Sequence, residues 1–280
     1  MLSLIYKYES EFSHFCFSAT DIHAPIGIHK VKIFRDFSND IQCYNLLHKI
    51  TEEGIPIYIK SWNSDLKNLK EIIFKEEKIE ESKELCLRLH AMVHSSDMSG
   101  IGLKTFEDEL WENMDEETFR TSTQKKGRTV AYGMWHSTRI EDITMNILVD
   151  GGQQVLNAEN MIEKINSSIK DTGNSLSPEE ILLFSRDIDM YWLREYRKAV
   201  GRKTESIIRK LEFKDMKRKI LPERLDRVID EGAVLKTEGS VWLIDFWGRK
   251  NVAGILFMPV LRHHLVHINE SMQAKKKRIK

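Results

Sequence analysis

Hydrophobic residues recur at helical spacing through most of this chain. The segment Glu84–Ser95 carries Leu85, Leu89 and Met92 on one side and runs into a Ser-Asp-Met-Ser-Gly breaker. The segment Gly127–Asp150 is longer and ends at a pair of glycines. Apolar residues three and four apart are typical of helices that bury one face, so we expect a helix over each segment.

Several helix starts can be read from the residues that favour them. Thr105 precedes a run of acidic residues, as an N-cap does, and predicts a short helix. Ser177-Pro178-Glu179-Glu180 combines an N-cap, a proline at the first position and first-turn acids, and predicts a helix to about Gly201. Leu221-Pro222 marks another start, and Met258–Gln273 is expected to be the final helix, beginning near Pro259. The segments Val234–Lys236 and Ser240–Trp247 are ambiguous between strand and loop.

Residues 1–81 have a different pattern. His29–Phe34 alternates polar and apolar residues and Ile55–Lys60 is rich in β-formers, which predicts two short strands around a helix at Asp40–Glu53. A Lys- and Glu-rich linker helix is expected at about Leu66–Glu81. The predicted fold is therefore mainly α, with an antiparallel four-helix bundle over residues 82–280 and a small N-terminal α+β appendage with its linker over residues 1–81.

Composition narrows the class of protein. Lys plus Arg and Asp plus Glu both number 43 among 280 residues, so no net charge attracts the chain to nucleic acid or to a membrane. No apolar run approaches the roughly 20 residues of a membrane span. The three cysteines show no zinc-ribbon spacing, and no secretory segment begins the chain. We expect a soluble cytoplasmic protein with no membrane partner and no nucleic-acid partner.

Three histidines are the strongest candidates for chemistry. His263 and His267 are four residues apart, so on a helix both imidazoles lie on one face. His136 lies in the middle of another expected helix, about 130 residues earlier. If the two helices face each other, the three imidazoles can hold one divalent metal ion and leave a coordination position open for catalysis.

Two alternatives remain open at this stage. His264 is also three residues from His267 and could replace His263 as a ligand. His90 and His94 form a second pair four apart in an earlier helix, where they could be hydrogen-bonded interior residues, could support the ligands, or could ligate directly. His94 is the best candidate for a fourth ligand that would close the site.

The segments around these histidines resemble two motifs of the DinB/YfiT-like metalloprotein superfamily. Residues 135–146, Trp-His-Ser-Thr-Arg-Ile-Glu-Asp-Ile-Thr-Met-Asn, resemble its second-helix motif, and residues 262–270, Arg-His-His-Leu-Val-His-Ile-Asn-Glu, resemble its last-helix motif. The resemblance covers roughly residues 82–280. It departs from the family pattern at the additional His264 and at the residues that follow His267.

The resemblance implies a four-helix bundle in which His136, His263 and His267 bind a divalent ion. Imidazole ligands suit Zn or Ni first, with Fe or Co as alternatives. The implied activity is that of a metal-dependent transferase or hydrolase that activates a bound water or thiolate, with a small molecule such as a low-molecular-weight thiol as substrate. Glu270 could act as a base and Arg139 could hold an anionic group. A homodimer is expected, and the alternative function is a non-catalytic metal-binding or dimerising bundle.

Overall fold

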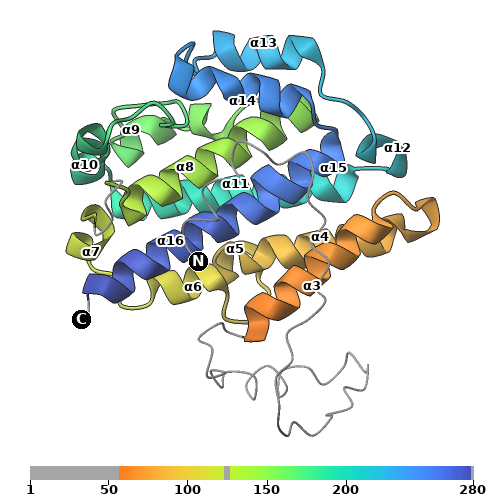
Figure 1. The fold of residues 1–280 in the computed structure, drawn as a ribbon, viewed down its shortest axis with the longest axis horizontal. Coiled ribbons are helices and arrows are strands. Elements are labelled where there is room, and N and C mark those ends of the chain that lie inside the picture. The colour runs from red at the N-terminus through yellow and green to blue at the C-terminus, as the bar shows by residue number, and fades with distance from the viewer. Residues whose placement is uncertain (1–56, 123–126, 279–280) are drawn as a thin grey trace, which may run out of the picture. The chain divides into compact units, whose positions relative to one another are not determined.

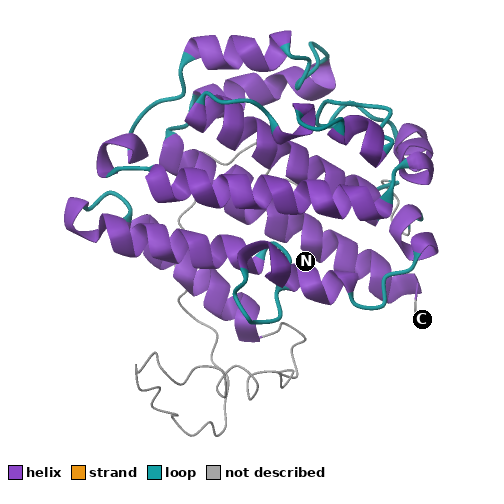
Figure 2. Ribbon diagram, turned by 180° about the vertical axis from the view of Figure 1, so that it is seen from behind, coloured by secondary structure: helices purple, strands orange, loops and turns teal. Residues whose placement is uncertain are grey.

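The computed structural model describes residues 57–122 and 127–278, and these residues are mainly α-helical, as predicted (Figure 2). Across these ranges the only β-type pairing is an isolated bridge between Lys219 and Asn251. The strand expected at residues 29–34 and the helix expected at 40–53 lie outside the described residues. The strand expected at residues 55–60 is wrong from Ile57 onward, because α3 (Ile57–Ile72) begins there. The helical spacing of Trp62, Leu66 and Leu69 outweighs the short β-forming run that precedes it.

The chain divides into two compact units, Met1–Gln42 and Cys43–Lys280, and all of the described residues belong to the second. The single linker helix expected at residues 66–81 is instead the end of α3, a turn, the short 3-10 helix η1 (Glu76–Lys78) and the start of α4 (Ile79–Met92). The indole nitrogen of Trp62 donates to the carbonyl of Leu89 at 3.0 Å, which fixes α3 along α4. The division expected between residues 81 and 82 stays a prediction.

The helix α8 (Val130–Asp142) is enclosed by the helices around it. It continues into a π-helical segment, η2 (Ile143–Asp150), and packs against α11 (Met190–Lys210) and α16 (His263–Arg278) (Figure 1). Every residue of α8 is buried, including its polar ones. Because buried polar groups must find partners, α8 is where the internal polar networks of the fold converge.

The final helical segment begins earlier than predicted. It runs through α15 (Val252–Ile255) and the π-helical η4 (Leu256–Arg262) into α16 without interruption. The expected start at Pro259 is wrong, since this proline lies inside η4. A proline lacks the N–H of a regular helical turn and clashes with the carbonyl four residues earlier, and a wider turn accommodates it.

The helix that begins after Ser177 is shorter than predicted. It is α10 (Pro178–Asp187), and a break at Ile188 separates it from α11. The side chain of Asp189 accepts a hydrogen bond from the N–H of Trp192, so Asp189 caps a new helix. Apolar residues continue across Ile188, so the hydrophobic pattern gives no sign of the break between α10 and α11.

The predicted helix starts at Thr105, Ser177 and Pro222 are confirmed. Thr105 and Asp108 form a reciprocal capping box at α6 (Phe106–Trp111), and Ser177 forms one with Glu180 at α10. Pro222 is the first residue of α13 (Pro222–Asp230). The ambiguous segment 240–247 lies in α14 (Glu238–Gly248). The remaining short helices are α5 (Ser96–Ser99), α7 (Glu116–Arg120), η3 (Val155–Asn157), α9 (Met161–Ile165) and α12 (Phe213–Met216).

Candidate metal centre

The structure brings His136, His263 and His267 together between α8 and α16. Their ring centroids lie 5.0 Å apart for His136 and His263, 4.9 Å for His136 and His267, and 4.5 Å for His263 and His267. The Nε2 atoms of His263 and His267 are 3.1 Å apart. Two ligands at about 2.1 Å from one tetrahedral ion would lie about 3.4 Å apart, so this spacing is close to that of a shared ion. We call these three residues the histidine triad.

The orientation of His136 is fixed by the loop that follows α9. Its Nδ1 lies 2.8 Å from the carbonyl oxygen of Thr172, and because a carbonyl only accepts, Nδ1 must carry the proton. The lone pair of His136 is therefore on Nε2. Tyr132, one turn earlier on α8, stacks on the ring at 5.4 Å with an angle of 9° between the planes. Metal-binding histidines are commonly fixed in this way through the second ring nitrogen.

Glu270 supports the triad from one turn further along α16. One of its carboxylate oxygens lies 3.1 Å from Nδ1 of His267, and Arg128 lies 3.2 Å from both of its oxygens. A small hollow adjoins this contact, lined by Arg128, Thr129, Gly133, Glu270, Ser271 and Ala274. Glu270, a residue selected from the sequence, therefore lies beside the triad residue His267 and beside the guanidinium of Arg128.

The electrostatics of His136 and His263 favour neutral imidazoles. Burial, together with the nearby imidazole of His267, lowers the pKa of His136 to about 3. Burial also lowers the pKa of His263 well below its ordinary value, and the imidazoles of His267 and His136 act in the same direction. Neutral imidazoles have a free lone pair for a metal ion at physiological pH.

Arg139 does not join the triad. Its guanidinium is 1% exposed and donates to partners elsewhere in the core. Its Nη1 lies 2.9 Å from Asp142 and 2.8 Å from the hydroxyl of Tyr196, and its Nη2 lies 2.6 Å from Gln154. The pairing of Arg139 with Asp142, which helix spacing predicts as a surface ion pair, is present but buried. With its donors engaged in this way, Arg139 has a structural position in the core.

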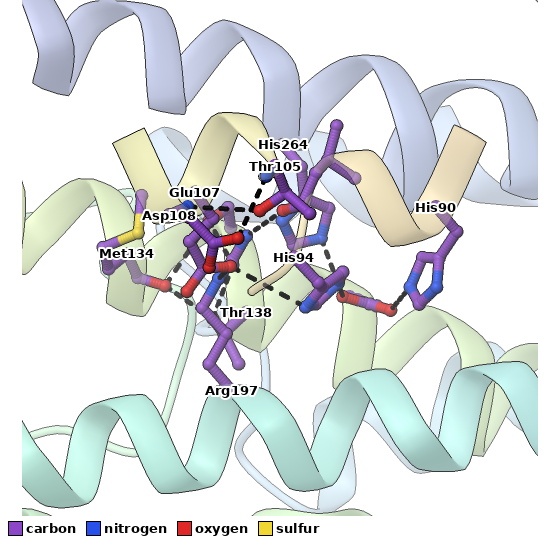
Figure 3. A network of polar contacts seen from close by, with 12 residues as sticks. His90, His94, Thr105, Glu107, Asp108, Met134, Thr138, Arg197 and His264 are labelled. Atoms are coloured by element: carbon purple, nitrogen blue, oxygen red, sulfur yellow. Dashed lines mark hydrogen bonds and ion pairs between the residues drawn. The ribbon is translucent and has the colours of Figure 1, made fainter. Parts of the chain in front are cut away.

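His90, His94 and His264 lie in a second cluster around Glu141, which we call the Glu141 cluster (Figure 3). His263 is therefore the residue that accompanies His267, and His264 faces away from the triad. His94 does not close the triad as a fourth ligand. Within residues 57–122 and 127–278, no further His, Cys, Asp or Glu shares the spacing of the triad.

Three contributors to these sites are not identified by the sequence. Glu141 is five residues after His136 and so is not on its face of α8, while Thr172 contributes only a backbone carbonyl. Arg128 lies before the helix begins and has no spacing relation to His267. None of the three follows from helix spacing, although Glu141, being buried on α8, requires a polar partner.

The comparisons with known proteins identify no relative of this chain. The chain matches no protein-family model and no curated protein sequence. In the part of the chain that the structure describes, no helix is both long and apolar enough to cross a membrane. The functional argument therefore depends on the geometry of the two clusters.

Proposed function

We propose that this protein is a metal-dependent enzyme in which His136, His263 and His267 bind one divalent ion. The observation that carries the proposal is the convergence of three imidazoles from two helices, with His136 and His267 buried, His263 half-buried, and the Nε2 atoms of His263 and His267 3.1 Å apart. The donor set suits Zn or Ni first, and Fe or Co as alternatives.

The chemistry follows from the charge and the openness of this donor set. Three neutral imidazoles leave the ion its double positive charge, so when bound it would lower the pKa of a coordinated water or thiol. No fourth protein ligand shares the triad's spacing among the described residues, which leaves room for such a group. A transferase that uses a small thiol, or a hydrolase, fits this arrangement.

The surrounding residues have roles that suit such a reaction. The Thr172 carbonyl holds the His136 ring so that Nε2 points at the other two ligands. The carboxylate of Glu270 orients His267 and lies at the hollow, where it can accept a proton from an incoming nucleophile. Arg128, on the same hollow, can hold a substrate anion in place.

The helices that carry the triad support a finer description of the fold. The helices α4, α8, α11 and α16 pack around one another, with α4 meeting the α16 segment through η4. We assign them as the four helices of a DinB-like bundle, to which α3 is added on the outside of α4. The motifs at residues 135–146 and 262–270 supply the resemblance that this assignment uses.

The experiment that tests the function uses the full-length chain, stripped of metal by a chelator and reloaded separately with Zn²⁺, Ni²⁺, Fe²⁺ or Co²⁺. Transfer of a small thiol to a chromogenic aryl halide and hydrolysis of a chromogenic ester are both measured. We expect turnover with at least one metal and its loss in His136→Ala. Ser137→Ala, a buried neighbour on α8 whose hydroxyl bonds to the Gly133 carbonyl and to Arg197, should retain it. A triad that binds metal without turnover in either assay would favour the non-catalytic alternative.

A further inference from the structure

We propose that His90, His94, His264 and Glu141 form a second divalent-cation site that is structural and separate from the triad. The residues come from three helices: His90 and His94 from α4, Glu141 from α8 and His264 from α16. No atom of their side chains is exposed to solvent.

The geometry converges on the Glu141 carboxylate. His90 Nε2 lies 2.7 Å from one of its oxygens, and the Nε2 atoms of His94 and His264 lie 2.9 Å and 2.8 Å from the other. Ligand atoms of His90, His94 and Glu141 all lie within 4.8 Å of one another. Donors about 2.1 Å from one ion are at most about 4.2 Å apart, so small side-chain rotations bring these three residues onto a cation. His264 lies outside this three-residue spacing and would join through its contact with the same Glu141 oxygen that His94 approaches.

The negative charge of the Glu141 carboxylate favours a bound cation. Glu141 is fully buried, and within the described ranges no lysine or arginine forms an ion pair with it. Without a metal ion, a carboxylate contacted only by neutral imidazoles keeps its negative charge uncompensated in the core, and protonating the carboxyl or an imidazole instead also costs free energy there. A divalent ion satisfies the carboxylate and takes the Nε2 lone pairs together.

Residues outside the cluster support its shape. Glu107 is held by Arg197 at 2.6 Å and by the indole of Trp111 at 2.9 Å, and its Oε2 lies 4.0 Å from Nδ1 of His94 (Figure 3). Nδ1 of His94 has no hydrogen-bond partner at this distance, and a shift of the ring toward Glu107 would let its N–H donate to the carboxylate, as ligating histidines commonly do. Gly201 of α11 makes room for the same ring, because a Cβ there would lie 3.0 Å from His94 Nδ1.

The two sites differ in a way that separates their roles. The triad has three neutral ligands beside a hollow, whereas the Glu141 cluster has four protein ligands, one of them anionic, in a closed interior. Four protein ligands are typical of structural metal sites. An ion in the Glu141 cluster would join α4, α8 and α16 and stabilise the packing on which the triad depends.

The test is the number of Co²⁺ ions bound per chain, measured by equilibrium dialysis of chelator-stripped full-length protein. We expect two ions in the natural sequence, one in His94→Gln and one in His136→Gln. Each variant is the matched control for the other. One ion in the natural sequence and none in His136→Gln would overturn the second site while leaving the triad intact. One ion in His136→Gln and none in His94→Gln would leave the second site standing and remove the triad on which the proposed function depends.

A second measurement covers the case in which His94→Gln does not fold. His136→Gln keeps the Glu141 cluster intact, so added Co²⁺ should raise its melting temperature and bind once per chain. In His136→Gln combined with Glu141→Gln, which preserves the size of the side chain and removes its charge, the shift should disappear. A His136→Gln protein that neither binds Co²⁺ nor gains thermal stability from it would overturn the proposal.

Discussion

His263 and His264 are consecutive residues of α16, but their imidazoles belong to different clusters. The Nε2 of His263 lies 3.1 Å from Nε2 of His267, whereas the Nε2 of His264 lies 2.8 Å from a Glu141 oxygen. Successive residues of a helix differ by about 100° in direction, so one helix can serve two sites with adjacent side chains. The same holds for α8, which carries both His136 and Glu141.

This separation predicts different effects for two adjacent substitutions. His263→Gln should remove the ion of the triad and any turnover that depends on it, while His264→Gln should leave both in place. Bound metal and activity, measured on the same preparations, check the prediction. Loss of activity in His264→Gln with the triad ion retained would place His264 in the reaction and contradict the assignment.

Asp142 pairs with the buried Arg139, and its loss should destabilise the fold. It accepts hydrogen bonds from Arg139, from the hydroxyl of Tyr196, from Asn146 and from the backbone N–H groups of Val155 and Leu156. Asp142→Asn leaves the charge of Arg139 unpaired in the core and should lower the free energy of unfolding by about 3–5 kcal/mol. Urea denaturation followed by circular dichroism measures the change.

Asp187→Asn is the control for this substitution. Asp187 pairs with Arg186 on the surface, where solvent screens the interaction, so the unfolding midpoint should not move measurably. Equal losses in the two variants would show that the burial of the Arg139 network has no energetic consequence.

The stability of the metal-free protein should fall on acidification. Burial lowers the pKa of His136 to about 3 and that of His94 to about 4, from 6.5 in the unfolded chain. Below pH 6.5 the unfolded chain therefore binds protons that the folded chain does not, and each histidine lowers the unfolding free energy by about 1.4 kcal/mol per pH unit until its folded pKa is reached. Stability should be full above pH 6.5 and decrease steadily toward pH 4.

Urea titrations at pH 7.5 and pH 5, with a chelator present, measure this dependence. His136→Gln removes one such group, so the slope of stability against pH should decrease by about one proton. An unchanged unfolding free energy between the two pH values would show that these imidazoles titrate normally in the folded chain.

Glu270 should affect the affinity of the triad for metal without being a ligand. Its carboxylate is 3.1 Å from Nδ1 of His267, and loss of such an outer contact typically weakens metal binding about 10–100-fold. Glu270→Gln should show a reduction of this size in a competition assay against a chelator. Arg128→Gln keeps the carboxylate beside His267 and should have a smaller effect; a larger one would identify Arg128 as the more important residue.

Local signals account for the parts of the fold that the sequence predicts. The capping residues Thr105 and Ser177 and the proline at position 222 act on the turn that they begin, so they can be recognised without knowing the tertiary structure. Pro259 and Asp189 gave wrong helix boundaries because their effects depend on structure beyond the turn in which they lie. The wide turns of η4 accommodate the proline, and apolar residues continue across the break that Asp189 caps.

The candidate site is likewise predicted in part by local spacing, whereas the rest of it depends on tertiary packing. Spacing places His263 and His267 on one face, and the family-like motifs add His136, but spacing cannot decide which of two neighbouring histidines faces α8. That choice depends on the rotation of α16, which packing determines over its whole length. Glu141 and the pair His90 and His94 become a cluster only when α4 lies against α8, a relationship between residues about 50 positions apart.

The complete enclosure of α8 has a consequence for how its backbone amides exchange with solvent. With every residue from Val130 to Asp142 buried, these amides gain access to deuterium only when the packing around them opens, so the slowest of them report the free energy of global unfolding. A bound ion adds its binding free energy to that opening. Deuterium uptake along α8 would therefore respond to an ion bound at either cluster, without any substrate.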